Sequence, residues 1–360
     1  MRIVVAMSGG VDSSVAAALL AREGHDVIGL SMQLYDQSPK ADGAQAHDAI
    51  TFGSCCTLDD LYDARRVAAA IGIPHYIVNF ERRFEEHVVA DFVREYAAGR
   101  TPIPCVHCNG DLKFASLVER AAGFDAEAVA TGHYARVEFD EPTGRYRLAR
   151  GVDTQKDQSY FLFTLSQAQL AHARFPVGHL DKAEVREQAR QLGLRVADKK
   201  DSQEICFVAP GEHPDFVAGR AALPPGLIRD RDGRELGRHE GIHRFTIGQR
   251  KGLGLSAGIP LYVVGIDAAT AAVTVGPRED LERTTLTASR VNWIGGDIPG
   301  APLRAHARIR HRHAEAVATI TPLDGDRAGV VFDTPQSAIT PGQAVVFYEG
   351  EYVLGGGWID

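Results

Sequence analysis

The first half of the chain alternates short apolar runs with amphipathic stretches. Runs such as Ile3–Ala6 and Val27–Met32 are mostly apolar, which is typical of strands buried on both faces of a parallel sheet. Between them, apolar positions recur with helical spacing, as in Leu58–Ile71, which Gly72 and Pro74 terminate. Strands that alternate with helices predict a doubly wound α/β domain built on a parallel sheet.

The same pattern predicts further elements before Cys206. They are strands at 75–78 and 126–130, helices at 84–96, 112–122, 166–173 and 182–192, and a hairpin of residues 136–139 with 146–149. Residues 36–54 are polar, small and without period, and are expected to form a mobile loop.

The composition of the chain changes after Cys206, where glycine and proline become frequent and the predicted strands become short. These strands are residues 262–266, 272–275, 305–309, 316–321, 328–332 and 344–348. Short strands with frequent turns predict small β-rich domains, barrel-like or sandwich-like. We therefore expect an α/β domain at 1–209, a central β-rich domain at 210–282, and a C-terminal barrel-like domain at 283–360.

Composition narrows the class of protein. The chain has 360 residues and a net charge of −8, and 44% of its residues are hydrophobic. No apolar run has the length of a membrane span, so we expect a cytoplasmic protein without a membrane partner. The charge argues against a uniformly basic RNA-binding surface, although a local basic surface remains compatible with it. The five cysteines are Cys55, Cys56, Cys105, Cys108 and Cys206, and without an export signal they favour reactive or metal-binding roles; none is evident for the first two.

The segment Ser8–Ser14, Ser-Gly-Gly-Val-Asp-Ser-Ser, lies between the first predicted strand and a helix expected to begin at Ser13 or Ser14. A strand, a glycine turn and a helix N-terminus together direct backbone N–H groups toward an anion. Asp12 is a candidate for positioning Mg²⁺. The segment lacks the lysine and the glycine spacing of a Walker A loop. An ordinary strand–turn–helix connection with serine caps is the alternative.

Two cysteine segments suggest redox or sulfur chemistry. Cys105 and Cys108 form a C-x-x-C just before a predicted helix, whose dipole would favour a thiolate. Cys206 follows Lys199 and Lys200, which would have the same effect. A structural zinc half-site is the alternative for the pair, but no second ligand pair stands at a suitable distance. Cys206 alone is also compatible with a buried apolar role.

Taken together, the motifs resemble those of the tRNA-specific 2-thiouridylases of the PP-loop ATP pyrophosphatase superfamily. The matching segments, in the order of that family, are residues 8–14, 101–109 with 113–114, 131–134, 156–161, 201–207, 247–254 and 341–343. The resemblance implies an ATP-dependent tRNA sulfurtransferase. Such an enzyme adenylates the C2 oxygen of the wobble uridine, replaces that oxygen with sulfur from a cysteine persulfide, and releases AMP and pyrophosphate.

The resemblance also implies roles for individual residues. ATP, with Mg²⁺, would contact Ala6, Met7, Ser8, Gly9, Gly10, Val11, Asp12, Ser13, Met32 and Gly132. Cys108 and Cys206 would be catalytic, the second carrying the persulfide, and would end the reaction as a disulfide. The target base and the tRNA would contact Ile103, Pro104, Cys105, His133, Lys156, Asp157, Gln158, Arg310, His311 and Gln343. The implied partners are tRNAs with Glu-, Gln- or Lys-type anticodons and a persulfide donor protein.

The chain departs from the family pattern at two positions, since Ile103 and Cys105 stand where Asn and Asp are common. Cys105, Cys108 and Cys206 together also form a possible ligand set for a [4Fe–4S] cluster with one open iron. An iron–sulfur-dependent thiolase is therefore an alternative.

The remaining alternatives are structural or belong to other classes of protein. Arg308, Arg310 and Arg312 would share one strand face, suited either to phosphates or to plain solvent exposure. His133 alone is compatible with packing at a strand end, and residues 156–158 with a solvated turn. Another PP-loop ATP pyrophosphatase, or an RNA-binding protein with a regulatory nucleotide loop, remains compatible with the loop at 8–14.

Overall fold

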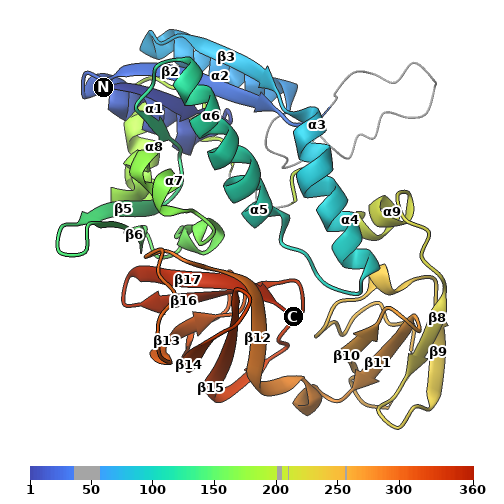
Figure 1. The fold of residues 1–360 in the computed structure, drawn as a ribbon. Coiled ribbons are helices and arrows are strands. Elements are labelled where there is room, and N and C mark those ends of the chain that lie inside the picture. Colours follow the sequence, from blue (N-terminus) through green and yellow to red (C-terminus); the bar gives the residue numbers. More distant parts are fainter. Residues whose placement is uncertain (36–56, 201–204, 210, 256–257) are drawn as a thin grey trace, which may run out of the picture.

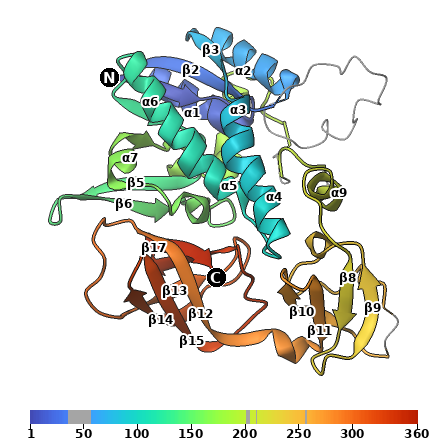
Figure 2. The ribbon, with the colours of Figure 1, turned by 45° about the vertical axis from the view of Figure 1, so that its right-hand side comes forward.

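The computed structural model describes residues 1–35, 57–200, 205–209, 211–255 and 258–360. The loop predicted at 36–54, together with Cys55 and Cys56, lies outside these ranges. The described part contains a parallel sheet with helices, a small four-stranded sheet and a barrel, arranged as shown in Figure 1 and, turned by 45°, in Figure 2.

A five-stranded parallel sheet forms the first unit, as predicted. Its order is β3-β2-β1-β4-β7, with β1 at Arg2–Ala6, β2 at Asp26–Gln33, β3 at His75–Asn79, β4 at Ala128–Ala130 and β7 at Ala173–Arg174. Alternate residues of β1 enter different cores: Ile3 and Val5 pack with α1 (Val11–Arg22), α2 (Leu58–Ile71) and α8 (Lys182–Gln191), whereas Val4 packs with α6 (Ala115–Gly123). Helices therefore cover both faces of this sheet.

Two continuous helical segments contain internal π turns. The first runs through α3 (Glu81–Phe84), the π segment Glu85–Val89 and α4 (Ala90–Ala97). The second runs through α5 (Pro104–His107), the π segment Cys108–Phe114 and α6. The second was predicted to begin near Leu112, but it begins eight residues earlier because Pro104 occupies the first turn, where its fixed φ suits a helix. Cys108 consequently lies inside the helix instead of before it.

The middle of the chain forms a four-stranded sheet after α9 (His213–Ala218). Its order is β10-β11-β8-β9, with β8 at Gly226–Arg229, β9 at Glu235–His239, β10 at Tyr262–Asp267 and β11 at Ala272–Gly276. The sheet encloses its own apolar core, which includes Val263 and Val273. Short helical turns elsewhere are Ser159–Leu162, α7 (Gln167–His172), Pro176–His179, Ile242–Arg244 and Arg278–Leu281.

The last strands close into a barrel. The order is β12-β15-β14-β13-β16-β17, and pairing of β12 with β17 completes the ring. The bounds are β12 Glu282–Trp293, β13 Leu303–Arg308, β14 Ala316–Leu323, β15 Arg327–Ser337, β16 Ala344–Glu349 and β17 Tyr352–Ile359. A closed ring leaves no open edge between these six strands. The prediction of a barrel is therefore confirmed.

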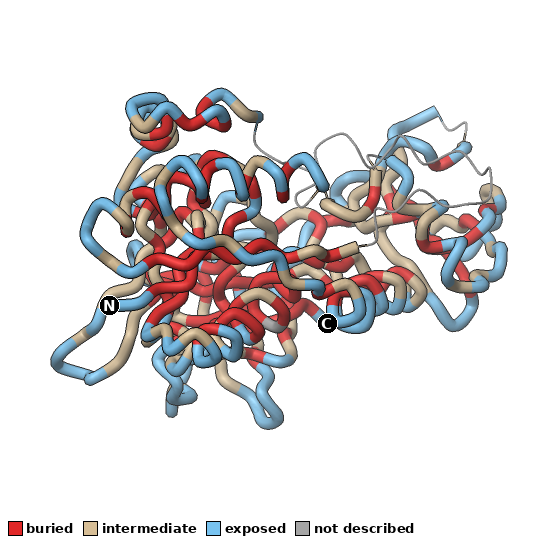
Figure 3. The backbone as a smooth tube through the Cα atoms, turned by 90° about the horizontal axis from the view of Figure 1, so that it is seen from above, coloured by how far each residue is buried: buried red, intermediate tan, exposed pale blue. Residues whose placement is uncertain are grey.

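The predicted hairpin is also present, but it extends the barrel sheet. Its strands are β5 (Ala135–Asp140) and β6 (Arg145–Arg150), and β6 pairs with β17 through Ala149 and Tyr352. A shared core fills the junction and includes Phe163, Tyr160 and Trp358. Seen from above in Figure 3, buried residues are concentrated along the middle of the molecule. Among the helices of the described residues, none is both long and apolar enough to cross a bilayer.

Replacing Phe163 by alanine tests this shared core. Its fully buried ring lies 5.3 Å from the ring of Trp358 on β17. Removal of a buried aromatic ring leaves a cavity, so the free energy of unfolding should fall by about 3–5 kcal/mol in denaturant titrations. Phe139→Ala is the matched control, because Phe139 is 49% exposed and should lose less than about 1 kcal/mol. Equal effects of the two substitutions would contradict a joint core.

Candidate active site

The turn between β1 and α1 is held by its own serines. The Ser13 hydroxyl accepts a hydrogen bond from the Ser8 backbone N–H at 3.1 Å and donates to the Gly10 carbonyl at 3.3 Å. The Ser14 hydroxyl donates to the same carbonyl at 2.8 Å. Helix α1 begins at Val11, two residues before the predicted start, with Gly10 as an extended N-cap. Asp12 and Ser13 therefore lie in the first helical turn, where the dipole favours anions.

Two glycines are required by close packing around this turn. Gly9 has φ +75°, and a Cβ there would collide with the Asp60 carbonyl of α2. A Cβ on Gly132, which follows β4, would collide with the backbone of Asp12 and Ser13. Gly10 differs, because its Cβ position meets only the Ser8 hydroxyl at 3.6 Å. The backbone at Gly10 is thus open to a ligand, as a phosphate-binding turn requires.

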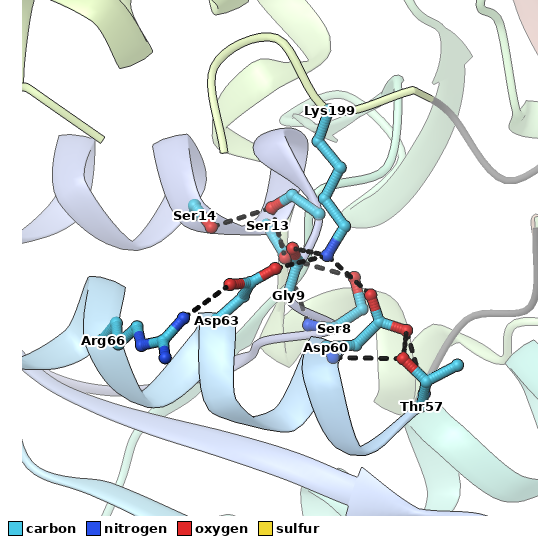
Figure 4. A network of polar contacts seen from close by, with 10 residues as sticks. Ser8, Gly9, Ser13, Ser14, Thr57, Asp60, Asp63, Arg66 and Lys199 are labelled. Carbon is cyan, nitrogen blue, oxygen red and sulfur yellow. Dashed lines mark hydrogen bonds and ion pairs between the residues drawn. The ribbon is translucent and has the colours of Figure 1, made fainter. Parts of the chain in front are cut away.

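Lys199 joins the turn to α2 (Figure 4). Its ammonium donates to the Gly9 carbonyl at 3.1 Å and to the carboxylates of Asp60 and Asp63 at 2.7 Å each. Burial lowers the pKa of Lys199, but hydrogen bonds and charges from the two carboxylates outweigh it, so that the pKa lies above its usual value. The expectation that Lys199 would favour a Cys206 thiolate does not match these contacts, since the ammonium is directed at the loop.

A second lysine reaches Asp12 from the first turn of α8. The Lys182 ammonium lies 2.8 and 2.9 Å from the two oxygens of the Asp12 carboxylate, and the Tyr134 hydroxyl donates to it at 2.8 Å. Both lysines come from the far end of the α/β unit in sequence. They lie beside a loop that has no lysine of its own, and each is paired with carboxylates: Lys182 with Asp12, and Lys199 with Asp60 and Asp63.

The three described cysteines differ in exposure. Cys105 lies exposed in the first turn of α5, Cys108 is only 7% exposed, and Cys206 is half-buried. Cys108 and Cys206 pack in the same apolar cluster, which also contains Met32 from the end of β2. The two predicted catalytic thiols and one predicted ATP contact therefore border the same apolar cluster.

The part of the chain that the structure describes shows no assembled metal or cluster site. Among the described residues, no group of three or more His, Cys, Asp or Glu side chains is arranged to hold a metal ion. The possible ligand set of Cys105, Cys108 and Cys206 is accordingly not gathered, and we derive no step through an iron–sulfur cluster.

His133 directly follows Gly132 and lies between aromatic rings. Its ring is 6.2 Å from that of Phe114 and 6.0 Å from that of Phe175. Its Nδ1 is 2.7 Å from the Thr131 hydroxyl. Burial, with a smaller contribution from the charge of Lys113, lowers the pKa of His133 to about 3. The imidazole is therefore neutral at physiological pH and adds no charge to the site.

Residues 156–158 do not form a simple solvated turn. Asp157 is 4% exposed, and its carboxylate accepts hydrogen bonds from the Gly151 and Ser159 backbone N–H groups and from the Ser159 hydroxyl. Gln158 accepts from the Tyr134 backbone N–H at 3.0 Å through its side chain. The segment therefore connects the barrel junction with the residues that hold Asp12.

The prediction that Arg308, Arg310 and Arg312 share one strand face is wrong. β13 ends at Arg308, and the chain turns there, so Arg310 and Arg312 lie outside the strand and do not alternate with it. Arg308 lies 3.8 Å from the buried Asp157 carboxylate. Arg310 donates to the Ser337 carbonyl at 3.2 Å, and His311 contacts the Asp157 carbonyl at 3.3 Å.

Gln343 holds the loop that leads to the cysteines. Its amide donates to the carbonyls of Thr101 and Pro102 at 2.9 and 3.3 Å. The Thr101 N–H in turn donates to the Pro341 carbonyl at 2.9 Å. Ile103, half-buried, and Pro104, buried, follow directly. The end of the barrel therefore fixes the approach to α5.

These features define a PP-loop nucleotide-binding domain joined to two β-rich units. Three family models match the chain: the tRNA methyl transferase HUP domain at residues 1–210, the tRNA methyl transferase PRC-barrel domain at 214–277, and the aminomethyltransferase beta-barrel domain at 283–359.

Curated relatives match over the full length. The tRNA-specific 2-thiouridylase MnmA of Solibacter usitatus is 55% identical, with 99% of each chain covered. The proteins of the same name from Geotalea uraniireducens and Geobacter metallireducens are each 53% identical, with all of this chain and 95% and 96% of theirs covered. The chain belongs to the tRNA-specific 2-thiouridylase family, whose superfamily uses ATP.

Sequence reasoning missed several residues of the site. Lys182, Tyr134 and Asp60 were not singled out, and Lys199 was given another role. Thr57 and Asp60 form a capping box at the start of α2, and this T-x-x-D pattern is visible in the sequence. Nothing in the local pattern indicates that Asp60 also contacts Lys199, about 140 residues later.

Replacing Lys199 by methionine tests the contact between the loop and α2. The substitution leaves Asp60 without its cation, while Asp63 keeps Arg66 at 3.7 Å, so unfolding free energy should fall by about 1–3 kcal/mol. Repulsion of phosphates should also weaken ATP binding in titration calorimetry. Because the pKa of Lys199 is raised, the stabilising contribution should be constant through neutral pH and be lost only in strong alkali.

The neighbouring exposed Lys200 provides the matched control. Lys200→Met removes the same charge and should leave both stability and ATP affinity near wild type. If the two substitutions behaved alike, the contact of Lys199 with Gly9 would have no role in the site.

Proposed function

We propose that the chain is an ATP-dependent tRNA-uridine 2-sulfurtransferase that acts on the wobble uridine. The packing of Cys108 and Cys206 against one apolar cluster, which also includes Ala6 directly before the nucleotide loop, carries the proposal. An ATP pyrophosphatase that only amidates or adenylates has no use for two thiols at this place. A regulatory nucleotide loop in an RNA-binding protein would have none either.

The first half-reaction uses the loop. The uridine C2 oxygen attacks the α-phosphorus of ATP, the bond to the β-phosphate oxygen breaks, and pyrophosphate leaves. The N–H groups near Gly10 suit the departing phosphates, and the Lys182 ammonium would join them once the Asp12 carboxylate releases it. Mg²⁺ would arrive with ATP. Binding of Mg²⁺ by Asp12 would require that its carboxylate release Lys182.

The second half-reaction uses the thiols. The terminal sulfur of a persulfide on Cys206 attacks C2, and AMP leaves with the oxygen. The Cys108 thiolate then attacks the Cys206 sulfur, so that the S–S bond breaks and 2-thiouridine is released with the terminal sulfur. The enzyme is left with a Cys108–Cys206 disulfide, and an external dithiol reduces it by two electrons.

Burial of Cys108 has a consequence for this sequence. Cys108 is only 7% exposed, so the π turn that contains it or the Cys206 segment would have to move before the thiol could reach a persulfide. We infer that binding of the RNA provides this rearrangement, since the target base must leave the anticodon stack to reach the site.

The remaining predicted contacts belong to the same proposal. Ala6, Met7, Ser8, Gly9, Val11, Ser13, Met32 and Gly132 would bind ATP together with Gly10 and Asp12; Ile103, Pro104 and Cys105 would contact the base; His133, Lys156, Asp157, Gln158, Arg310, His311 and Gln343 would contact tRNA. For Asp157 and Gln343, the observed contacts favour a role in positioning neighbouring segments. The tRNA anticodon types, the persulfide donor protein and a cytoplasmic location are expected on the same grounds.

Serine substitutions test the assignment of the thiols. Cys108→Ser and Cys206→Ser should each reduce 2-thiouridine formation by more than about a thousandfold, because a hydroxyl cannot replace either sulfur. Release of pyrophosphate should continue in both variants, since neither sulfur takes part in adenylation. Nucleoside mass spectrometry and a pyrophosphate assay with tRNA measure the two steps.

Cys105→Ser is the matched control. Cys105 is exposed, and we expect this variant to keep most of the thiolation activity. An inactive Cys105→Ser enzyme, together with iron in an active wild type, would favour the cluster-dependent alternative. Formation of ADP and phosphate in place of AMP and pyrophosphate would refute the ATP pyrophosphatase assignment.

A further inference from the structure

A polar cavity lies where the end of α4 meets the barrel. Its volume is about 160 Å³, and its lining comes from α4, the following loop, β12, the loop before β16, and β17. The lining residues are Arg94, Glu95, Arg100, Ser289, Arg290, Gly342, Trp358 and Ile359. No predicted site residue is among them, but Gly342 directly precedes Gln343, and Arg100 directly precedes the loop to α5.

The cavity carries an excess of positive charge. Arg94 pairs with Asp91 and Arg100 pairs with the buried Glu95, so two of the three arginines are neutralised. Arg290 is exposed, and within the described part of the chain it forms no ion pair. Its guanidinium instead lies 4.3 Å from the centre of the Trp358 ring. One full cation therefore remains at the cavity.

The indole of Trp358 supplies an unused donor. Trp358 is 9% exposed, and its Nε1 is buried without a hydrogen-bond partner among the described residues. Its ring is held by stacking on His107 at 5.2 Å and by contact with Phe163. Leaving a buried N–H unsatisfied is unfavourable, unless a ligand accepts a hydrogen bond from it.

The backbone at Arg290 has an unusual conformation, and this conformation sets the direction of its side chain. Arg290 has φ +49°, a left-handed conformation that favours glycine. It lies in a β-bulge, because the pairing of β12 with β17 skips from Ser289 to Asn292 while the partner strand advances from Trp358 to Gly356. Bulges of this kind commonly carry glycine. The bulge changes the direction of the Arg290 side chain, and the left-handed backbone of a non-glycine residue lowers stability.

We propose that this cavity binds a phosphate group, held by the Arg290 guanidinium and the Trp358 N–H. Planar guanidinium groups match phosphate oxygens, and a buried donor beside one completes an anion site. In the complex with RNA, the phosphate is one of the tRNA backbone, close to the loop that leads to Cys108. This part rests on the proposed function; a free phosphate is the other source of the same chemistry.

The test compares four proteins in tRNA binding at several salt concentrations. Arg290→Gly removes the guanidinium and suits the left-handed backbone, so the protein should melt no lower than wild type. Its affinity for tRNA should fall about tenfold, and the slope of log affinity against log salt should decrease by about one phosphate contact. Trp358→Phe keeps an aromatic ring but loses the N–H, and should weaken binding by about three- to tenfold.

Arg327→Ala is the charge control, since Arg327 is an exposed arginine on β15 of the same barrel. It should change tRNA affinity by less than about twofold. Wild-type affinity and slope in Arg290→Gly would overturn the RNA assignment. Melting with and without inorganic phosphate then identifies the source: a phosphate-dependent rise present in wild type and lost in Arg290→Gly supports a free anion.

If Arg290→Gly kept both the wild-type tRNA binding and the phosphate-dependent rise in melting temperature, the phosphate site itself would be overturned. Failure of the proposed function is recognised separately, because wild-type protein would then release no pyrophosphate with tRNA and bind no tRNA. The phosphate melting experiment remains informative in that case, since it uses no RNA.

Discussion

The close contact between the Gly9 backbone and α2 is the constraint on which the site depends. It brings a strand-to-helix turn against the carbonyl of Asp60, and only a residue without a Cβ fits there. Lys199 stabilises the same contact, because its ammonium binds the Gly9 carbonyl and two carboxylates of α2. The turn is thereby fixed by protein contacts before any nucleotide arrives, and its Gly10 side is left open for a ligand. Preorganisation of this kind reduces the ordering cost of binding phosphates.

The loop, the two lysines and the thiols lie on one unit, but the approach to the thiols is fixed by another. Gln343 and Pro341, from the end of the barrel, hold Thr101 and Pro102 through backbone groups. The hairpin β5–β6 extends the barrel sheet while its own chain continues into the segment that contains Asp157. An RNA that contacts the barrel is therefore mechanically connected to the helix that contains Cys108.

Much of this architecture could be predicted from local pattern. Buried runs such as Ile3–Ala6 and the spacing of Leu58–Ile71 follow directly from burial, and the structure confirms the elements they predict. The predictions that were wrong concerned residues whose partners lie far away in the sequence. Arg308, Arg310 and Arg312 alternate in the sequence, but the strand ends where Arg308 meets the buried Asp157. Lys199 lies near Cys206 in sequence, yet its contacts are with residues 9, 60 and 63. Charge attraction over such separations leaves no periodic trace in the sequence.

The π segment at Cys108–Phe114 sets the rotation of the turn that carries Cys105 and Cys108 relative to α6. A π turn contains one residue more than an α turn closing at the same place, and one residue corresponds to about 100° of rotation about the axis. The face that Cys105 and Cys108 present is therefore offset by that angle from the face that an unbroken helix would give them relative to α6. Deletion of a single residue between Asn109 and Phe114 would preserve every side chain of the cysteine motif and still turn both sulfurs away from their present surroundings. The number of residues in this stretch is thus as much a part of the site as their identity.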